Sequence, residues 1–171
     1  MNFSIEISER SAKDGINLFT AYHYLLAVLS LAGALAVIIF ALFPAFSGES
    51  ETGVFFPIVG LIVALALTGA YFYTARGLAA TKNQARMYAI FLSFVGIFGG
   101  LIAILAVMVG LVNSPEPNWM NVGVTAFALI MGYSLLSFLD VFVLIFFTND
   151  RIRSVFYGSD WLAQAKEEVE E

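Results

Sequence analysis

Residues 87–111 read MYAIFLSFVGIFGGLIAILAVMVGL and contain no charged side chain. A helix needs about 20 consecutive, mostly apolar residues to cross the hydrocarbon core of a bilayer. A strand of a membrane barrel would alternate apolar and polar residues over about ten positions, and this run does not alternate. Because hydrocarbon offers the backbone no hydrogen bonds, a helix that satisfies its own peptide groups is favoured there. We therefore predict a transmembrane helix over these residues.

Three further segments have the same character and are separated by polar breaks, which gives predicted spans at about 19–43, 54–74, 87–111 and 122–147. Hydrophobic residues make up 60% of the 171 residues and charged residues 12%, against about 25% charged in soluble domains. The predicted fold class is all-α. It is a transmembrane four-helix bundle over residues 1–158, with a short interfacial C-terminal helix and an acidic cytoplasmic tail over 159–171.

The basic residues fall on one side of this four-span pattern. They precede span one, lie between spans two and three, or follow span four: Arg10, Lys13, Arg76, Lys82, Arg86, Arg151, Arg153 and Lys166. Lysine and arginine are retained on the cytoplasmic side of a membrane. We expect a multi-pass protein of the cytoplasmic membrane with both termini in the cytoplasm, and with the loops 44–53 and 112–121 outside.

The residues after span four predict an amphipathic helix on the membrane surface. Asp150 is expected to cap this helix, and Ile152, Val155 and Phe156 share one of its faces. Asp160 is expected to begin a second short helix. The alternative is a frayed tail next to the membrane.

Small residues mark the faces on which the spans are expected to pack. Gly96 and Gly100 form a Gly-x-x-x-Gly motif in span three, and Gly60 and Ala64 have the same spacing in span two. Lipid is as apolar as leucine, so close backbone approach drives helices together in a membrane. We expect packing inside the bundle, with a homodimer contact through Gly96 and Gly100 as the alternative.

Asp140 is the one acidic residue within a predicted span. Ser137 and Tyr133 precede it by three and seven residues, so the three form a polar stripe on one helix. A charge is costly at this depth and should face the bundle interior or a water-filled crevice. A proton-linked or cation-linked site is the functional interpretation. We favour a structural carboxyl that ties span four to its neighbours.

His23 is the only histidine and lies at a similar depth in span one. Its imidazole could pair with Asp140 in a proton relay, but its place near the interface favours a solvated or lipid-facing role. One histidine and no cysteine give too few ligands for a convincing metal site or a self-contained haem. We expect no metal and no cofactor.

The basic residues Arg76, Lys82 and Arg86 lie on the loop between spans two and three, and Arg151 and Arg153 follow span four. The simpler interpretation is that they set the topology of the chain. The alternative is that they bind anionic lipid headgroups or a partner.

Several short motifs resemble those of a broad group of small, uncharacterised four-helix membrane proteins of prokaryotes. Lys13–Leu18 (KDGINL) is similar to their basic-x-Gly-Ile/Val lead into the first helix. Ala75–Leu78 (ARGL), followed by Gln84–Arg86 (QAR), is similar to their Gly-Leu…Trp-Ala-Arg element, with Gln84 in place of tryptophan. The exit Phe147–Phe156 resembles their common ending. The resemblance implies four spans and no particular activity.

The chain contains no nucleophile elbow, phosphate loop or zinc-protease motif, and no basic patch that predicts nucleic-acid binding. We expect a non-enzymatic protein that contacts the bilayer and other membrane subunits or itself: an accessory or scaffold subunit, or a homo-oligomer. A small proton- or cation-linked transporter or channel-like oligomer that uses Asp140 is the alternative. A membrane enzyme acting on lipid ranks third.

Overall fold

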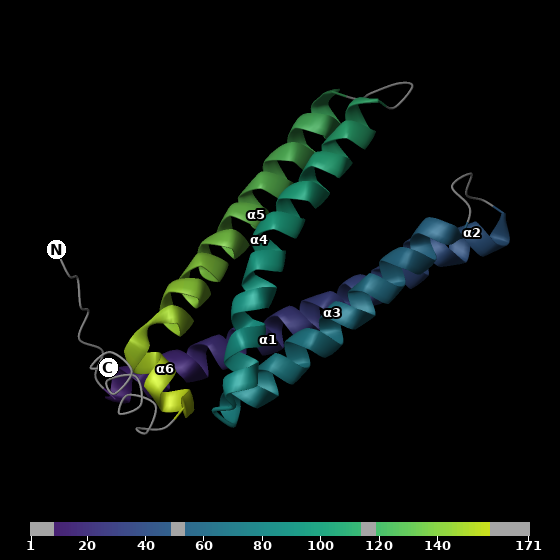
Figure 1. Cartoon of the computed structure of the whole chain (residues 1–171). Coiled ribbons are helices and arrows are strands. Elements are labelled where there is room, and N and C mark those ends of the chain that lie inside the picture. The colour runs from purple at the N-terminus through teal and green to yellow at the C-terminus, as the bar shows by residue number, and fades with distance from the viewer. Residues whose placement is uncertain (1–8, 49–53, 114–118, 158–171) are drawn as a thin grey trace, which may run out of the picture. The chain divides into compact units, whose positions relative to one another are not determined.

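The computed structural model describes residues 9–48, 54–113 and 119–157, which are helical almost throughout (Figure 1). The elements in chain order are α1 (Glu9–Val37), the π turn η1 (Ile38–Leu42), α2 (Phe43–Ser47), α3 (Phe55–Ala79), α4 (Asn83–Val112), α5 (Trp119–Thr148) and α6 (Asp150–Tyr157). The predicted all-α class, with four long apolar helices and a short helix after them, is confirmed. The expected acidic tail and the second surface helix from Asp160 lie outside the described residues.

Four segments of the described chain are long and apolar enough to cross a membrane: Ser11–Ser47, Phe55–Ala79, Asn83–Val112 and Val122–Thr148. Their length and composition are those of an integral membrane protein. The longest has 37 residues and would measure about 55 Å at 1.5 Å per residue, whereas the hydrocarbon core is about 30 Å thick. The helices run past the predicted spans, mostly at the end with the basic residues, because backbone hydrogen bonding continues beyond the apolar segment.

One compact unit contains the described residues up to Tyr88 together with those from Ser154 on. Within it, α1 packs along α3 (Figure 1). Most of the buried side chains of α1 recur at helical spacing: Ala12, Ile16, Phe19, His23, Ala27 and Ala34, with Thr20 and Tyr22 buried beside them. On α3 they gather near its C-terminal end: Thr74, Ala75 and Leu78. Most of the other large apolar side chains of both helices are exposed, as lipid-facing residues of a spanning helix are.

A tight turn joins α3 to α4. The Thr81 N–H donates to the Leu78 carbonyl and the Lys82 N–H donates to the Gly77 carbonyl, each at 2.9 Å. This pair of bonds is a Schellman motif, in which the residue after the helix cap adopts a left-handed conformation. That residue is Thr81, with a φ of 49°. Glycine is the usual residue there, because a β-branched side chain is strained at positive φ.

The first spanning segment passes through a π turn close to its C-terminal end. The Phe43 N–H donates to the Ile38 carbonyl, five residues back, and Pro44 follows in the first turn of α2. A proline ring in a regular helix collides with the carbonyl four residues earlier, and the wider π turn is a local departure that makes room for it. Helix therefore continues to Ser47, where we had predicted a loop from Pro44 on.

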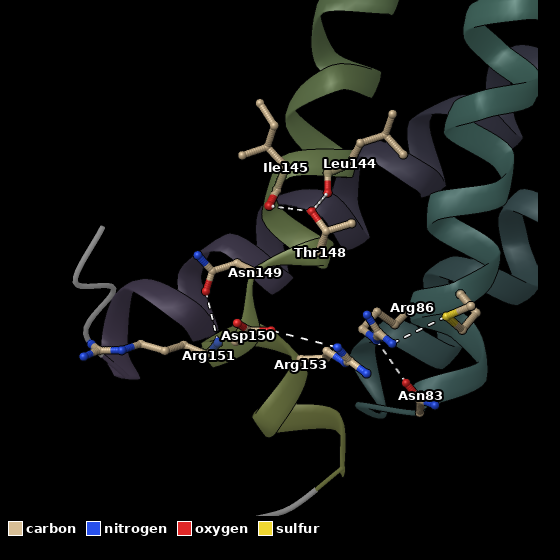
Figure 2. Close-up of polar contacts among 10 residues, drawn as sticks. Asn83, Arg86, Leu144, Ile145, Thr148, Asn149, Asp150, Arg151 and Arg153 are labelled. Carbon is tan, nitrogen blue, oxygen red and sulfur yellow. Dashed lines mark hydrogen bonds and ion pairs between the residues drawn. The ribbon is translucent and has the colours of Figure 1, made fainter. Parts of the chain in front are cut away.

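The second compact unit is Ala89–Arg153, in which α4 and α5 run side by side (Figure 1). Just past the end of α5, the Asn149 side chain accepts a hydrogen bond from the Arg151 N–H at 3.0 Å (Figure 2). The Asn149 carbonyl accepts one from the Arg153 N–H at 2.9 Å. These bonds make Asn149 the N-cap of α6. The prediction that Asp150 is the cap was wrong. Asp150 is the first residue inside the helix, where its negative charge interacts favourably with the positive end of the helix dipole.

The apolar face of α6 is narrower than predicted. Ile152 and Phe156, four residues apart, are buried, whereas Val155 is exposed. Residues four apart on a helix differ by about 40° in direction, so this pair points the same way and Val155 lies to one side.

Candidate intramembrane site

The carboxyl of Asp140 on α5 lies directly against the backbone of Gly96 on α4. Asp140 is only 7% exposed. A Cβ atom built onto Gly96 would overlap Oδ2 of this carboxyl, whereas a Cβ at the nearby Gly99 would meet only an ordinary contact with Val95 of its own helix. Glycine at position 96 therefore creates the space that the carboxyl occupies.

Gly100, the second glycine of the motif, packs against Tyr133. Asp140 and Tyr133 lie on the same face of α5, so this face packs against both glycines. A Cβ on Gly100 would lie 2.8 Å from Cε2 and 2.9 Å from Cδ2 of the Tyr133 ring. The Tyr133 hydroxyl donates to the Ile97 carbonyl at 2.6 Å. A helical carbonyl has a second lone pair available for such a bond. The Gly-x-x-x-Gly face therefore lies inside this helical hairpin.

Two serine hydroxyls flank the carboxyl along the two helices. Ser137 precedes Asp140 by three residues on α5, and Ser93 precedes Gly96 by three residues on α4. Both hydroxyl oxygens are buried without a hydrogen-bond partner in the described structure, and Ser93 is 1% exposed. An unpaired buried hydroxyl costs about 1 to 3 kcal/mol, and such groups are rare enough in native proteins to need an explanation. The stripe predicted from Tyr133, Ser137 and Asp140 is thus extended by Ser93 of the neighbouring helix.

His23 belongs to the other compact unit, and its polar contact is local. Its Nδ1–H donates to the Phe19 carbonyl at 2.7 Å, and its ring lies 5.6 Å from that of Tyr22 and 6.1 Å from that of Tyr71. His23 is 1% exposed, so the solvated or lipid-facing role that we favoured is wrong. Burial is tolerated because the helix supplies an acceptor for the ring N–H and two aromatic rings flank the imidazole.

The other predicted packing pair, Gly60 and Ala64 on α3, makes a looser arrangement. A Cβ on Gly60 would meet nothing within 4 Å. Ala64 contributes its carbonyl, which accepts a hydrogen bond from the Thr68 hydroxyl at 2.8 Å. No close approach in the structure requires a glycine at position 60.

Arg86 is buried at the start of α4, 4% exposed, so it does not face headgroups as one interpretation required. Its Nε donates to Asn83 Oδ1 at 3.0 Å and its Nη2 contacts the Met87 sulfur at 3.5 Å (Figure 2). The guanidinium also lies 5.6 Å from the ring centre of Tyr157, within the range of a cation–π interaction. Arg86 therefore joins the N-terminal end of α4 to the C-terminal end of α6.

The basic residues of α6 remain at the surface. Arg151 is exposed. Arg153 forms a loose ion pair with Asp150 at 3.9 Å (Figure 2). Exposed pairs of this kind add little stability. The role of these two arginines in topology stays a prediction from the sequence.

The sequence reasoning did not identify the closest contact of the α3–α4 turn. A Cβ on Gly77 would overlap the side chain of Ala85. Ala75, Leu78 and Ala85 are almost completely buried around this contact. The signal was present in the ARGL and QAR motifs, which the structure brings together, but their sequence does not say that they touch.

Side chains that could hold a metal ion are sparse. Within residues 9–48, 54–113 and 119–157, no three histidine, aspartate or glutamate side chains form a group that could bind one. What the Asp140 region offers is one carboxyl, two serine hydroxyls and the tyrosine-bonded carbonyl of Ile97. Such a set can hold or pass a proton, or anchor two helices.

Comparison of the chain with models of protein families, with curated proteins and with solved structures finds no match. The resemblance to the small four-helix membrane proteins of prokaryotes stays a prediction from the sequence.

Proposed function

We propose that this protein is a non-enzymatic accessory or scaffold subunit, or a homo-oligomer, of the cytoplasmic membrane, with both termini in the cytoplasm. The observation that carries the proposal is an exposed face of small residues on α4. This small-residue face consists of Gly99, Ala103, Ala106 and Gly110, all of them exposed.

The spacing of these residues places them on one side of the helix. Steps of four, three and four residues follow the helical repeat. A Cβ on Gly110 would meet nothing within 4 Å. The face partly overlaps in direction with the one on which Gly96 and Gly100 receive α5, but its four residues are exposed, so α5 does not cover it. Small residues that permit close backbone approach are typical of helix–helix contacts in membranes, and this face offers such a contact to another helix.

The absence of cysteine from the chain makes a direct test possible. Ala103→Cys introduces the only thiol, so a disulfide can form only between two copies. A cross-linked dimer in native membranes supports the homo-oligomer. Purification in a gentle detergent followed by mass spectrometry identifies a different partner.

A large side chain placed on the small-residue face can be compared with the same side chain placed next to the face. Gly110→Leu is expected to abolish the cross-link or the co-purification, whereas Val109→Leu, next to it and outside the face, is expected to leave either one intact. A chain that gives no cross-link as Ala103→Cys, and that as wild type is recovered as a monomer without a partner, would overturn the proposal.

A proton- or cation-linked transporter is the second candidate, and the unpaired hydroxyls of Ser93 and Ser137 beside Asp140 favour it. Its test is flux into liposomes that contain the purified protein. A transporter loses flux with Asp140→Asn and keeps it with Asp14→Asn, a matched change at an exposed residue. Wild-type flux no greater than that of empty liposomes rules this candidate out.

A further inference from the structure

A hollow of about 410 Å³ lies at the turn between α3 and α4, and all the residues around it belong to one compact unit. The hollow, which we call the α3–α4 hollow, is lined by Tyr73, Arg76, Gly77, Ala80, Lys82 and Ala85. Neither the subunit role nor the transporter role proposed above uses it.

The charge of the hollow has one sign. Arg76 and Lys82 are two of the three cations of this turn, and no acidic side chain is among the lining residues. The third cation, Arg86, is held by Asn83 and Tyr157 and is buried. The structure thus separates the three basic residues: one packs inside, and two line an open hollow.

The floor of the hollow is made by small residues. Gly77 and Ala85 meet so closely that no side chain fits at position 77. Ala80 lines the hollow and is exposed. The small side chain of Ala80 therefore helps to leave space for a ligand among the longer lining side chains.

The wall of the hollow has the character of a membrane interface. The Tyr73 ring packs edge-on against Tyr88, with centres 5.5 Å apart. Amphipathic aromatic rings of this kind are enriched at the level of lipid headgroups. The hollow also lies at the ends of two spanning segments, next to their lipid-facing residues.

From these observations we infer that the α3–α4 hollow binds the phosphate group of an anionic lipid. Two cations without a lining carboxylate suit a phosphate. The adjoining lipid-facing helix surfaces suit the acyl chains of the same molecule. A free inorganic phosphate would share the first feature and lack the second.

The test is lipid titration of the full-length protein in a neutral detergent, with bound lipid counted by native mass spectrometry. Phosphatidylglycerol is expected to bind more tightly than phosphatidylcholine. Arg76→Gln combined with Lys82→Gln is expected to weaken phosphatidylglycerol binding on the order of tenfold or more, because each cation near a headgroup contributes about a fivefold factor. Arg151→Gln combined with Arg153→Gln removes the same charge from α6 and is expected to leave binding nearly unchanged.

A steric pair of variants tests the hollow without altering charge. Ala80→Phe is expected to fill it and reduce phosphatidylglycerol binding, whereas Ala79→Phe, at the neighbouring exposed residue outside the lining, is not. The inference is overturned if Ala80→Phe binds like wild type, or if both pairs of charge variants lose binding equally. It is also overturned if inorganic phosphate at equal concentration displaces the lipid completely.

Discussion

At the scale of single residues, adding a methyl group at position 96 tests whether the Asp140 carboxyl needs the space that Gly96 leaves. Gly96→Ala would push its Cβ into the Asp140 carboxyl, and overpacking of this kind costs about 1 to 3 kcal/mol. We expect Gly96→Ala to lower the free energy of unfolding in mixed micelles, whereas Gly99→Ala, which has room for its methyl group, should raise it by about 0.4 to 1 kcal/mol because alanine has less freedom than glycine in the unfolded chain. Equal stabilities of the two variants would show that the carboxyl does not depend on the glycine.

Thr81 provides a prediction of the opposite sign. Its φ of 49° costs an L-residue about 1 to 2 kcal/mol, whereas a glycine there loses about 0.4 to 1 kcal/mol through its greater freedom in the unfolded chain. Thr81→Gly should therefore stabilise the protein by about 0.5 to 1 kcal/mol, measured by unfolding in micelles. Ala80→Gly, at a φ of −93°, gains nothing from the freedom of glycine and should destabilise. A destabilised Thr81→Gly would contradict the left-handed turn.

At the scale of elements, α6 depends on its first hydrogen bond. Asn149→Ala removes the acceptor for the Arg151 N–H, and loss of such a cap costs about 1 kcal/mol. We expect hydrogen exchange of the α6 amides to accelerate about fivefold. Asp150→Ala removes a carboxylate at the helix start but leaves the Asn149 cap in place, and should have a smaller effect. A larger effect at Asp150 would restore that residue as the cap.

The elements also show how far the sequence could lead. The four spans could be predicted from composition, because a run of about 20 consecutive apolar residues indicates a helix that crosses the bilayer. The burial of His23 and the exposure of Val155 did not, because both depend on the direction in which a helix face points. Asn149 and Asp150 are neighbours with equal aptitude as caps, and only the observed hydrogen bond distinguishes them.

The candidate site was predicted in part for the same reason. Asp140, Ser137 and Tyr133 could be grouped because they share one helix, where spacing fixes relative position. Their fit against Gly96 and Gly100, and the place of Ser93 beside them, depends on the register between α4 and α5. No pattern within a single span determines that register, since lipid tolerates any apolar side chain on the remaining faces.

At the scale of the whole molecule, the proposed orientation can be tested with single cysteines. Ser47→Cys and Gln84→Cys lie at exposed positions at opposite ends of the membrane-spanning helices. We expect a membrane-impermeant maleimide to label Ser47→Cys in intact cells and Gln84→Cys only after permeabilisation. The basic residues of the α3–α4 turn provide the reason, since they are retained in the cytoplasm. The reverse pattern would invert the topology, and labelling of both would contradict a span between them.

The π turn before Pro44 gives the C-terminal part of the first span a tolerance of length change that the described parts of the other three spans lack. Its hydrogen bond encloses one residue more than a regular turn does. Loss of a single residue between Ile38 and Leu42 would thus be absorbed by reversion to ordinary α geometry, without rotating α2 relative to α1. The same deletion in the uninterrupted α5 would turn everything beyond it by about 100°. Natural variants of different length should accordingly tolerate indels near position 40 and exclude them near position 136.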